Sequence, residues 1–149
     1  MNIPGLRSPD DEVGGIVYFG RMLDKVRLHA EGKLPADYVE NLGDGFDLRC
    51  VNFLGVKYAD VVEWVKSGMT DEEVLGKCLK EGSGATEEQI EVWNDFMRKR
   101  GWRDAASERV AFRLREAGID GDTDIETMFE FIDFDEGRRP ARRAPVAQG

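Results

Sequence analysis

The chain has 149 residues, about the length of one domain, and its 30 acidic side chains outnumber its 21 lysines and arginines to give a net charge of −9. Such an acidic protein repels phosphate backbones, so we expect no nucleic-acid partner. No apolar run is long enough to span a bilayer, and the first residues show no signal-peptide pattern, so we expect no membrane association and a cytoplasmic location.

Apolar residues at helical spacing predict an all-α fold, a compact single-domain bundle of about seven short to medium-length helices. No segment alternates with period two, so no strands are predicted. Three capping-box patterns mark helix starts, at Thr70–Glu73, Thr86–Gln89 and Thr123–Glu126. The predicted helices cover residues 14–31, 46–54, 58–67, 71–81, 87–100, 104–117 and 124–134.

The last twelve residues differ in composition from the rest of the chain. They are rich in arginine, proline and alanine and almost free of large apolar side chains. Such a composition cannot bury enough apolar surface to order the backbone. We therefore predict a helical domain over residues 1–137 and a disordered tail over 138–149.

Metal and redox chemistry find little support in the sequence. Cys50 and Cys78 lie on apolar arcs of predicted helices without a CxxC spacing, so we expect buried, reduced thiols. The acidic run DGDTDIE has Ile125 and Phe131 where a calcium loop needs glycine and glutamate. The chain has a single histidine. No metal and no cofactor are therefore expected.

The helix predicted over residues 14–31 carries polar side chains beside its apolar face. At about 100° per residue, Tyr18, Arg21, Lys25 and His29 form one ladder that borders the apolar arc. In the next predicted helix, Asp47 falls in the middle of an apolar arc. An unpaired buried carboxylate is costly, so we expect Asp47 to lie within about 4 Å of Arg21, Lys25 or His29, or to cap its own helix.

Two interpretations of this polar seam remain open. In the first, the seam binds a small anionic or polar ligand through Tyr18, Arg21, Lys25 and Tyr38, and His29 and Asp47 transfer protons as candidate catalytic residues. The loop that carries Tyr38 would then fold over the ligand. In the second, the seam is a structural ion network in a non-catalytic module that binds a protein partner. The sequence leaves open whether the protein is an enzyme.

A second cluster of charge surrounds the predicted end of the helix over residues 87–100. The stretch RKRGWR gathers Arg98, Lys99, Arg100 and Arg103. Cations suit the negative end of a helix dipole, which accounts for the cluster without any ligand. Contact with a phosphate group or a partner is the alternative.

Four separated stretches also resemble a known family. RMLDKVRLHAEGKLPADY, NLGDGFDLRC, FLGVKY and EVWNDFMRKRGWRD are similar to sequences of an uncharacterised bacterial family of small proteins, catalogued as domain of unknown function 5069. The similarity extends from about Leu6 to Gly137 and leaves the arginine-rich end outside. It implies a stand-alone, largely helical bacterial domain, and it implies no activity.

Overall fold

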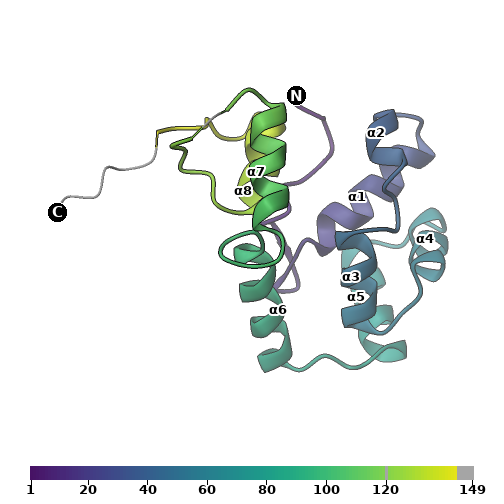
Figure 1. The fold of residues 1–149 in the computed structure, drawn as a ribbon. Coiled ribbons are helices and arrows are strands. Elements are labelled where there is room, and N and C mark those ends of the chain that lie inside the picture. Colours follow the sequence, from purple (N-terminus) through teal and green to yellow (C-terminus); the bar gives the residue numbers. More distant parts are fainter. Residues whose placement is uncertain (120, 144–149) are drawn as a thin grey trace. The chain divides into compact units, whose positions relative to one another are not determined.

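A computed structural model of the protein describes residues 1–119 and 121–143, which form eight helices and one two-stranded sheet (Figure 1). The predicted mainly helical class is therefore confirmed, with a helix count close to the expected seven. The chain divides into two compact units. One comprises residues 5–94, the other residues 1–4 and 95–149, and each is described below by itself.

Most of the elements follow one another with short connections. The strands are β1 (Glu12–Val13) and β2 (Ile16–Val17). The helices are α1 (Phe19–Ala30), α2 (Ala36–Val39), α3 (Phe46–Leu54), α4 (Tyr58–Lys66), α5 (Asp71–Glu81), α6 (Glu87–Lys99), α7 (Ser107–Glu116) and α8 (Met128–Asp135). Helix α2, a single turn, was not predicted. The predicted bounds of α3 to α6 agree with these to within one residue.

An antiparallel hairpin of β1 and β2 precedes α1, where the sequence pattern predicted helix from residue 14 onward. The turn residues Gly14 and Gly15 both have positive φ, 56° and 81°. These values suit a two-residue hairpin turn, for which a Gly-Gly pair is a known signal. Strands of two residues are too short to show a period-two alternation, so the pattern missed them.

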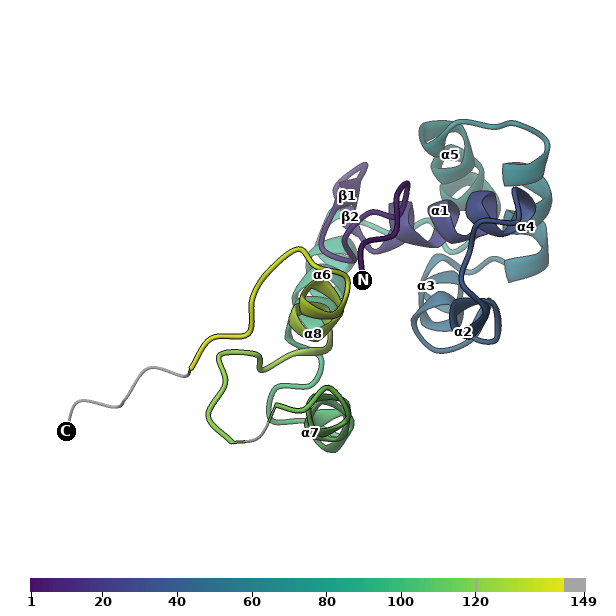
Figure 2. The same ribbon diagram turned by 90° about the horizontal axis from the view of Figure 1, so that it is seen from above.

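Helix α1 is the central element of the unit formed by residues 5–94. Nine of its twelve residues are buried. It contacts α4 and β1, and Figure 2 shows α3 and α5 on opposite sides of it. The buried set contains the apolar core of the helix and also Arg21, Asp24 and Lys25. Tyr18, Arg21 and Lys25 of the polar ladder therefore lie deeper than their predicted place at the border of the apolar face, whereas His29 is exposed.

The ends of α3 and α5 meet at Gly82. The Ser83 amide donates to the Leu54 carbonyl at 2.9 Å, and the Ser83 hydroxyl donates to the Phe53 carbonyl at 3.0 Å. A Cβ atom added to Gly82 would lie 1.9 Å from the Leu54 carbonyl oxygen. Only glycine allows this approach of two backbones.

In the unit formed by residues 1–4 and 95–149, α7 and α8 pack on a small apolar core of Val110, Leu114, Ile125 and Phe131. The capping box of α8 is Thr127–Glu130, and the predicted box at Thr123–Glu126 is absent. The Thr123 hydroxyl instead accepts from the Ile125 amide, so the helix starts four residues later than predicted.

The predicted tail, residues 138–149, lies partly outside the described residues, which end at 143. Its first residues contact the same unit. Arg138 pairs with Asp133 at 3.0 Å, and Arg139 pairs with Asp124 at 2.7 Å and with Glu130 at 3.1 Å. The basic residues at the start of this segment thus balance the acidic side chains around α8.

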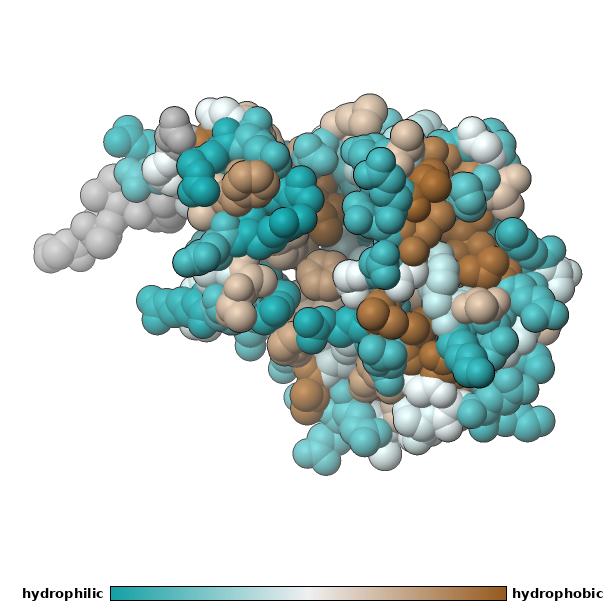
Figure 3. All heavy atoms as spheres, turned by 45° about the vertical axis from the view of Figure 1, so that its right-hand side comes forward, coloured by the Kyte–Doolittle hydropathy of each residue, from teal (hydrophilic) through white to brown (hydrophobic). Residues whose placement is uncertain are grey.

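The surface is largely hydrophilic, as the charged fraction of 34% leads one to expect. The face in Figure 3 is covered mostly by hydrophilic residues, with smaller hydrophobic patches between them. Among the described residues no helix combines the length and the apolar character that a membrane crossing requires.

We predict that Gly82→Ala lowers the free energy of unfolding by at least about 3 kcal/mol, because the backbone oxygens that a methyl group meets cannot rotate away. Gly76→Ala is the matched control. Gly76 lies within α5, where a Cβ meets nothing within 4 Å, so this change should raise the free energy by about 0.5–1 kcal/mol. Urea denaturation measures both. Equal effects of the two changes would contradict this account of Gly82.

Candidate functional site

Tyr18 is the N-cap of α1, and its backbone is strained. Its φ of 72° and ψ of −28° lie in the left-handed region, which is rare for an aromatic residue. The side chain is nonetheless buried and ordered by its contacts, with its ring edge-on to Phe46 at 5.7 Å between centroids. This backbone conformation sends the Tyr18 hydroxyl toward α3.

Asp47 meets that hydroxyl from the first turn of α3. Tyr18 donates to Asp47 Oδ1 at 2.6 Å, and the Gly43 amide donates to Asp47 Oδ2 at 3.1 Å. The Asp47 side chain is fully buried. Its place in the first helical turn also suits a negative charge, because the helix dipole is positive there.

Lys25 completes the cluster from α1. Its ammonium nitrogen lies 2.8 Å from Asp47 Oδ1 and donates to the Tyr18 hydroxyl at 2.9 Å. The expected pairing of Asp47 with one of the three cations is therefore present, and the cation is Lys25. The three side chains form a closed triangle in which each contacts the other two. We call Tyr18, Lys25 and Asp47 the triad.

Burial fixes the protonation of the groups around the triad. Desolvation, and then the charge of Asp47, raises the pKa of the Tyr18 hydroxyl well above its ordinary value, although Arg21 opposes the shift. The same two causes raise the pKa of the Cys50 thiol and of the Tyr58 hydroxyl. At neutral pH, Tyr18 is therefore a hydrogen-bond donor, and Cys50 is a thiol without nucleophilic character.

The segment before α3 covers the buried carboxylate. Gly43 has a φ of 79°, and a Cβ added there would lie 2.8 Å from the ring of Tyr58. The Tyr58 ring thus holds Gly43 in place while its amide donates to Asp47. Tyr58 was not predicted as part of the site, and Gly43 was predicted only as part of the loop expected to fold over a ligand.

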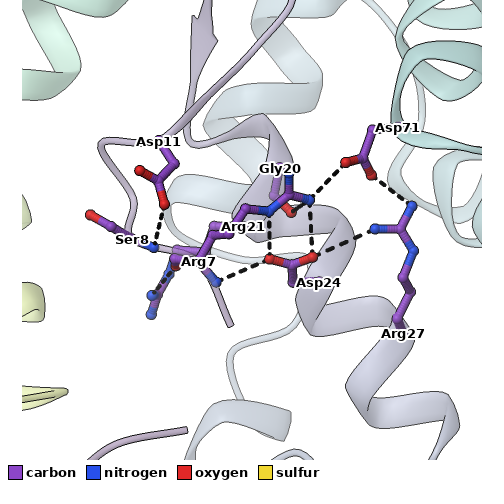
Figure 4. Close-up of polar contacts among 8 residues, drawn as sticks. All are labelled: Arg7, Ser8, Asp11, Gly20, Arg21, Asp24, Arg27 and Asp71. Atoms are coloured by element: carbon purple, nitrogen blue, oxygen red, sulfur yellow. Dashed lines mark hydrogen bonds and ion pairs between the residues drawn. The ribbon is translucent and has the colours of Figure 1, made fainter. Parts of the chain in front are cut away.

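A second ion network flanks α1, and the sequence pattern did not reveal it (Figure 4). The Arg7 guanidinium lies between two carboxylates, at 2.8 Å from Asp24 and 2.9 Å from Asp71. Arg27 closes the network through Asp71 at 2.7 Å. Arg21, buried on α1, donates to the carbonyl of Arg7 at 3.1 Å. This network ties the N-terminal segment and α5 to α1.

The other three predicted site residues, Arg21, His29 and Tyr38, are not part of the triad. Arg21 is buried and close enough to influence Tyr18 electrostatically. His29 is exposed in the last turn of α1, and its side chain has no hydrogen bond or ion pair within the described residues. Tyr38 is half-buried on α2. The structure thus joins Tyr18, Lys25 and Asp47, with Arg21 near them, and leaves His29 at the surface.

Both cysteines are free and buried, as predicted. Burial raises the pKa of Cys78 to about 11, with a smaller contribution from Glu81. Within residues 1–119 and 121–143, no group of three His, Cys, Asp or Glu side chains is placed to hold a metal ion.

We predict that Asp47→Ala lowers the free energy of unfolding by about 3–5 kcal/mol, because it leaves the Lys25 ammonium and the Tyr18 hydroxyl buried without their acceptor. Urea denaturation at neutral pH measures the loss. Asp44→Ala is the control, since Asp44 is an exposed carboxylate three residues away, and its removal should cost less than about 0.5 kcal/mol. A loss below about 1 kcal/mol at Asp47 would contradict a closed triad.

Stability should also fall in alkali. The raised pKa values keep Tyr18, Cys50 and Cys78 neutral in the folded state, whereas the unfolded chain ionises above its ordinary values of 9.0 for cysteine and 10.0 for tyrosine. The stabilisation is complete below those values and is lost as the pH rises through the folded-state pKa values. The free energy of unfolding should therefore drop by about 3 kcal/mol between neutral pH and about pH 10.5.

Urea titrations at the two pH values test this expectation. A variant with Cys50→Ala and Cys78→Ala should lose much less stability in alkali, because the thiols, with the lower ordinary pKa of 9.0, account for most of the drop up to about pH 10.5. Equal alkaline losses in the variant and the original protein would show that the thiols are not the cause.

Comparison with known families places these residues in a wider group. A family profile described as "Domain of unknown function (DUF5069)" matches residues 3–138, which include the triad, the network around Arg7 and all eight helices. No curated protein matches the sequence. The profile covers well over half of the chain and confirms the resemblance carried by the four stretches. The chain therefore belongs to the family described as Domain of unknown function (DUF5069).

Proposed function

We propose that the protein binds a small anionic or polar molecule at the triad. The observation that carries this proposal is the backbone of Tyr18. A tyrosine in the left-handed region costs free energy, and here that cost brings its hydroxyl to Asp47 and Lys25. Backbone strain of this kind concentrates at functional sites, where the surrounding structure maintains it.

The burial of an ion pair supports the same proposal. Taking Lys25 and Asp47 out of water costs several kcal/mol, and apolar residues of similar size often stabilise a fold as well or better. A strained tyrosine next to a buried ion pair therefore has little value for stability alone. A cluster of perturbed ionisable groups is a typical candidate for binding or proton transfer.

The residues of the triad have different roles in the proposed binding. The Lys25 side chain is 9% exposed and that of Asp47 is 0% exposed, so Lys25 is the more accessible of the two charged side chains. The Tyr18 hydroxyl stays protonated and donates a hydrogen bond. Arg21 adds positive potential from the same helix. The exposed His29 lies outside the cluster and takes no part in this binding.

Entry to the site involves residues 40–45, the segment that covers Asp47. Within the part of the chain that the structure describes, this segment contacts the carboxylate through the hydrogen bond from the Gly43 amide. A displacement of this segment exposes Asp47 Oδ2 and leaves the contacts of Tyr18 and Lys25 with Oδ1 in place. The Gly43 amide is therefore a direct reporter of the site.

We predict that titration with acetate or with inorganic phosphate moves the amide resonance of Gly43 in a saturable way in ¹H–¹⁵N spectra. The amide of Gly68, at the end of α4, should not move. Tyr18→Phe, which removes only the hydroxyl, should weaken the apparent affinity by about tenfold, since a hydrogen bond to a charged group contributes about 1.5–3 kcal/mol.

Two lysine variants complete this experiment. Lys25→Met should abolish the saturable shift, whereas Lys33→Met, at an exposed lysine beside Glu31, should preserve it. Circular dichroism confirms that each variant is folded, and Tyr18→Phe serves alone if Lys25→Met does not fold. Absence of a saturable shift with both anions, or its loss in Lys33→Met, would refute the proposed site.

The alternative function is a non-catalytic interaction module in which the triad is only structural. The complete burial of Asp47 favours it, because Tyr18, Lys25 and the Gly43 amide already satisfy both oxygens of this carboxylate. The two functions differ in one outcome. A structural triad makes Asp47→Ala destabilising while neither anion moves the Gly43 resonance.

A further inference from the structure

The stretch that runs from the end of α6 through most of α7 is basic in an otherwise acidic protein. Residues 98–115 carry seven arginines or lysines and only two acids, in a chain with a net charge of −9. The whole segment lies in the unit that contains residues 95–149. A local excess of positive charge in a protein whose net charge is negative points to a negatively charged partner.

Exposed aromatic rings accompany these cations. Trp102 is 45% exposed and Phe96 is 40% exposed. The guanidinium carbon of Arg103 lies 4.9 Å from the ring centroid of Trp102, and that of Arg100 lies 5.5 Å from the centroid of Phe96. Tryptophan, other aromatics and arginine are the residue types enriched at interfaces and at their energetic centres.

The turn that presents Trp102 is strained and firmly held. Arg103 has a φ of 49°. Within the described part of the chain, Tyr18 and Arg103 are the residues other than glycine that have a positive φ. The Asp104 carboxylate accepts from the amides of Gly101 and Ala106 at 2.8–3.1 Å. Asp104 thus fixes Trp102 and Arg103 before any partner binds, which lowers the entropic cost of association.

The cations of this surface are largely uncompensated. Within residues 1–119 and 121–143, Lys99 and Arg103 have no carboxylate oxygen within 4 Å, and Arg100 has only a 3.5 Å contact with Asp104. By contrast, the buried Lys25 and the half-buried Arg7 of the other unit are each paired with a carboxylate at 2.8 Å.

We propose that Phe96, Lys99, Arg100, Trp102 and Arg103 form a docking surface for an acidic segment of another protein, one that also carries apolar side chains. The weakly compensated cations select carboxylates, and the two rings supply apolar contact area that a purely ionic partner would not use. We call these five residues the Arg–aromatic surface. It is independent of the triad, which lies in the other unit.

A protein segment fits this surface better than a nucleic acid. A long polyanion extends beyond the basic segment and meets the remaining charge of the protein, which is strongly negative. One face of the Trp102 ring is already covered by Arg103, which leaves less ring surface for base stacking. A short segment with acidic and apolar side chains does not extend to the negatively charged remainder of the protein. It can bind the cations through its carboxylates and the aromatic rings through its apolar side chains.

Fluorescence anisotropy tests the proposal with the full chain and three labelled probes. The first is a short peptide that alternates Asp or Glu with Leu or Phe, the second is the same peptide with Lys in place of each acid, and the third is oligo(dT). We expect the acidic peptide to bind and to bind more weakly as salt rises, and we expect the Lys peptide not to bind.

Four variants locate the binding. Arg103→Glu and Trp102→Ala should each weaken binding of the acidic peptide by about tenfold or more. Lys57→Glu, an equal charge change at an exposed lysine of the other unit, should leave it unchanged. Arg103→Gly relieves the positive φ, so its Tm should not fall below that of the original protein, and its binding should still be lost.

Several results would overturn the proposal. These are absence of binding by the acidic peptide, equal weakening by Lys57→Glu, retained affinity in Arg103→Gly, and tighter binding of oligo(dT), which would assign the surface to a nucleic acid. Sedimentation of the protein alone provides the last check. If self-association depended on Arg103, the partner would be a second copy of this chain.

Discussion

Helix α1 buries three charged side chains, and the unit formed by residues 5–94 depends on how they are compensated. An unpaired charge in the interior costs several kcal/mol, so each one requires a partner from outside the helix. Arg7 in the N-terminal segment meets Asp24, and its own carbonyl accepts from Arg21. Asp47 in α3 meets Lys25. The charges of α1 therefore determine which segments pack against it and in which register.

The network around Asp71 extends the same constraint to α5. Burial alone would raise the pKa of Asp71, but the hydrogen bonds and charges of Arg27 and Arg7 outweigh it and lower that pKa. The resulting stabilisation is present above the ordinary pKa of 3.8 and is lost as the pH falls through the lowered value. Such pairs add little net stability compared with apolar residues, but a misplaced α5 would separate Asp71 from both Arg7 and Arg27, so they favour one arrangement.

The parts of the fold that the sequence predicted are those controlled by local interactions. The Thr70–Glu73 capping box and the left-handed Gly55 set helix bounds that agree with the structure, because both act within one turn. The pairing of Asp47 was predictable because a carboxylate in an apolar arc must find a cation. The role of Arg7 was not, since it lies in a segment without periodicity and its partners are distant in sequence. Likewise, the left-handed backbone of Tyr18 depends on contacts with α3 that no local pattern encodes.

Backbone strain connects the two sites proposed for this protein. Within the described residues, Tyr18 and Arg103 are the residues other than glycine with positive φ. Each is held by an aspartate near the start of a helix, Tyr18 by Asp47 in α3 and the Arg103 turn by Asp104 just before α7. If these positions served only to turn the chain, glycine would do so at lower cost. A glycine, however, would lose the hydroxyl that bridges Lys25 and Asp47 in one case and the guanidinium that lies over Trp102 in the other. The strain is therefore best understood as the cost of placing a particular side chain, which is the physical reason to look for function at these two positions first.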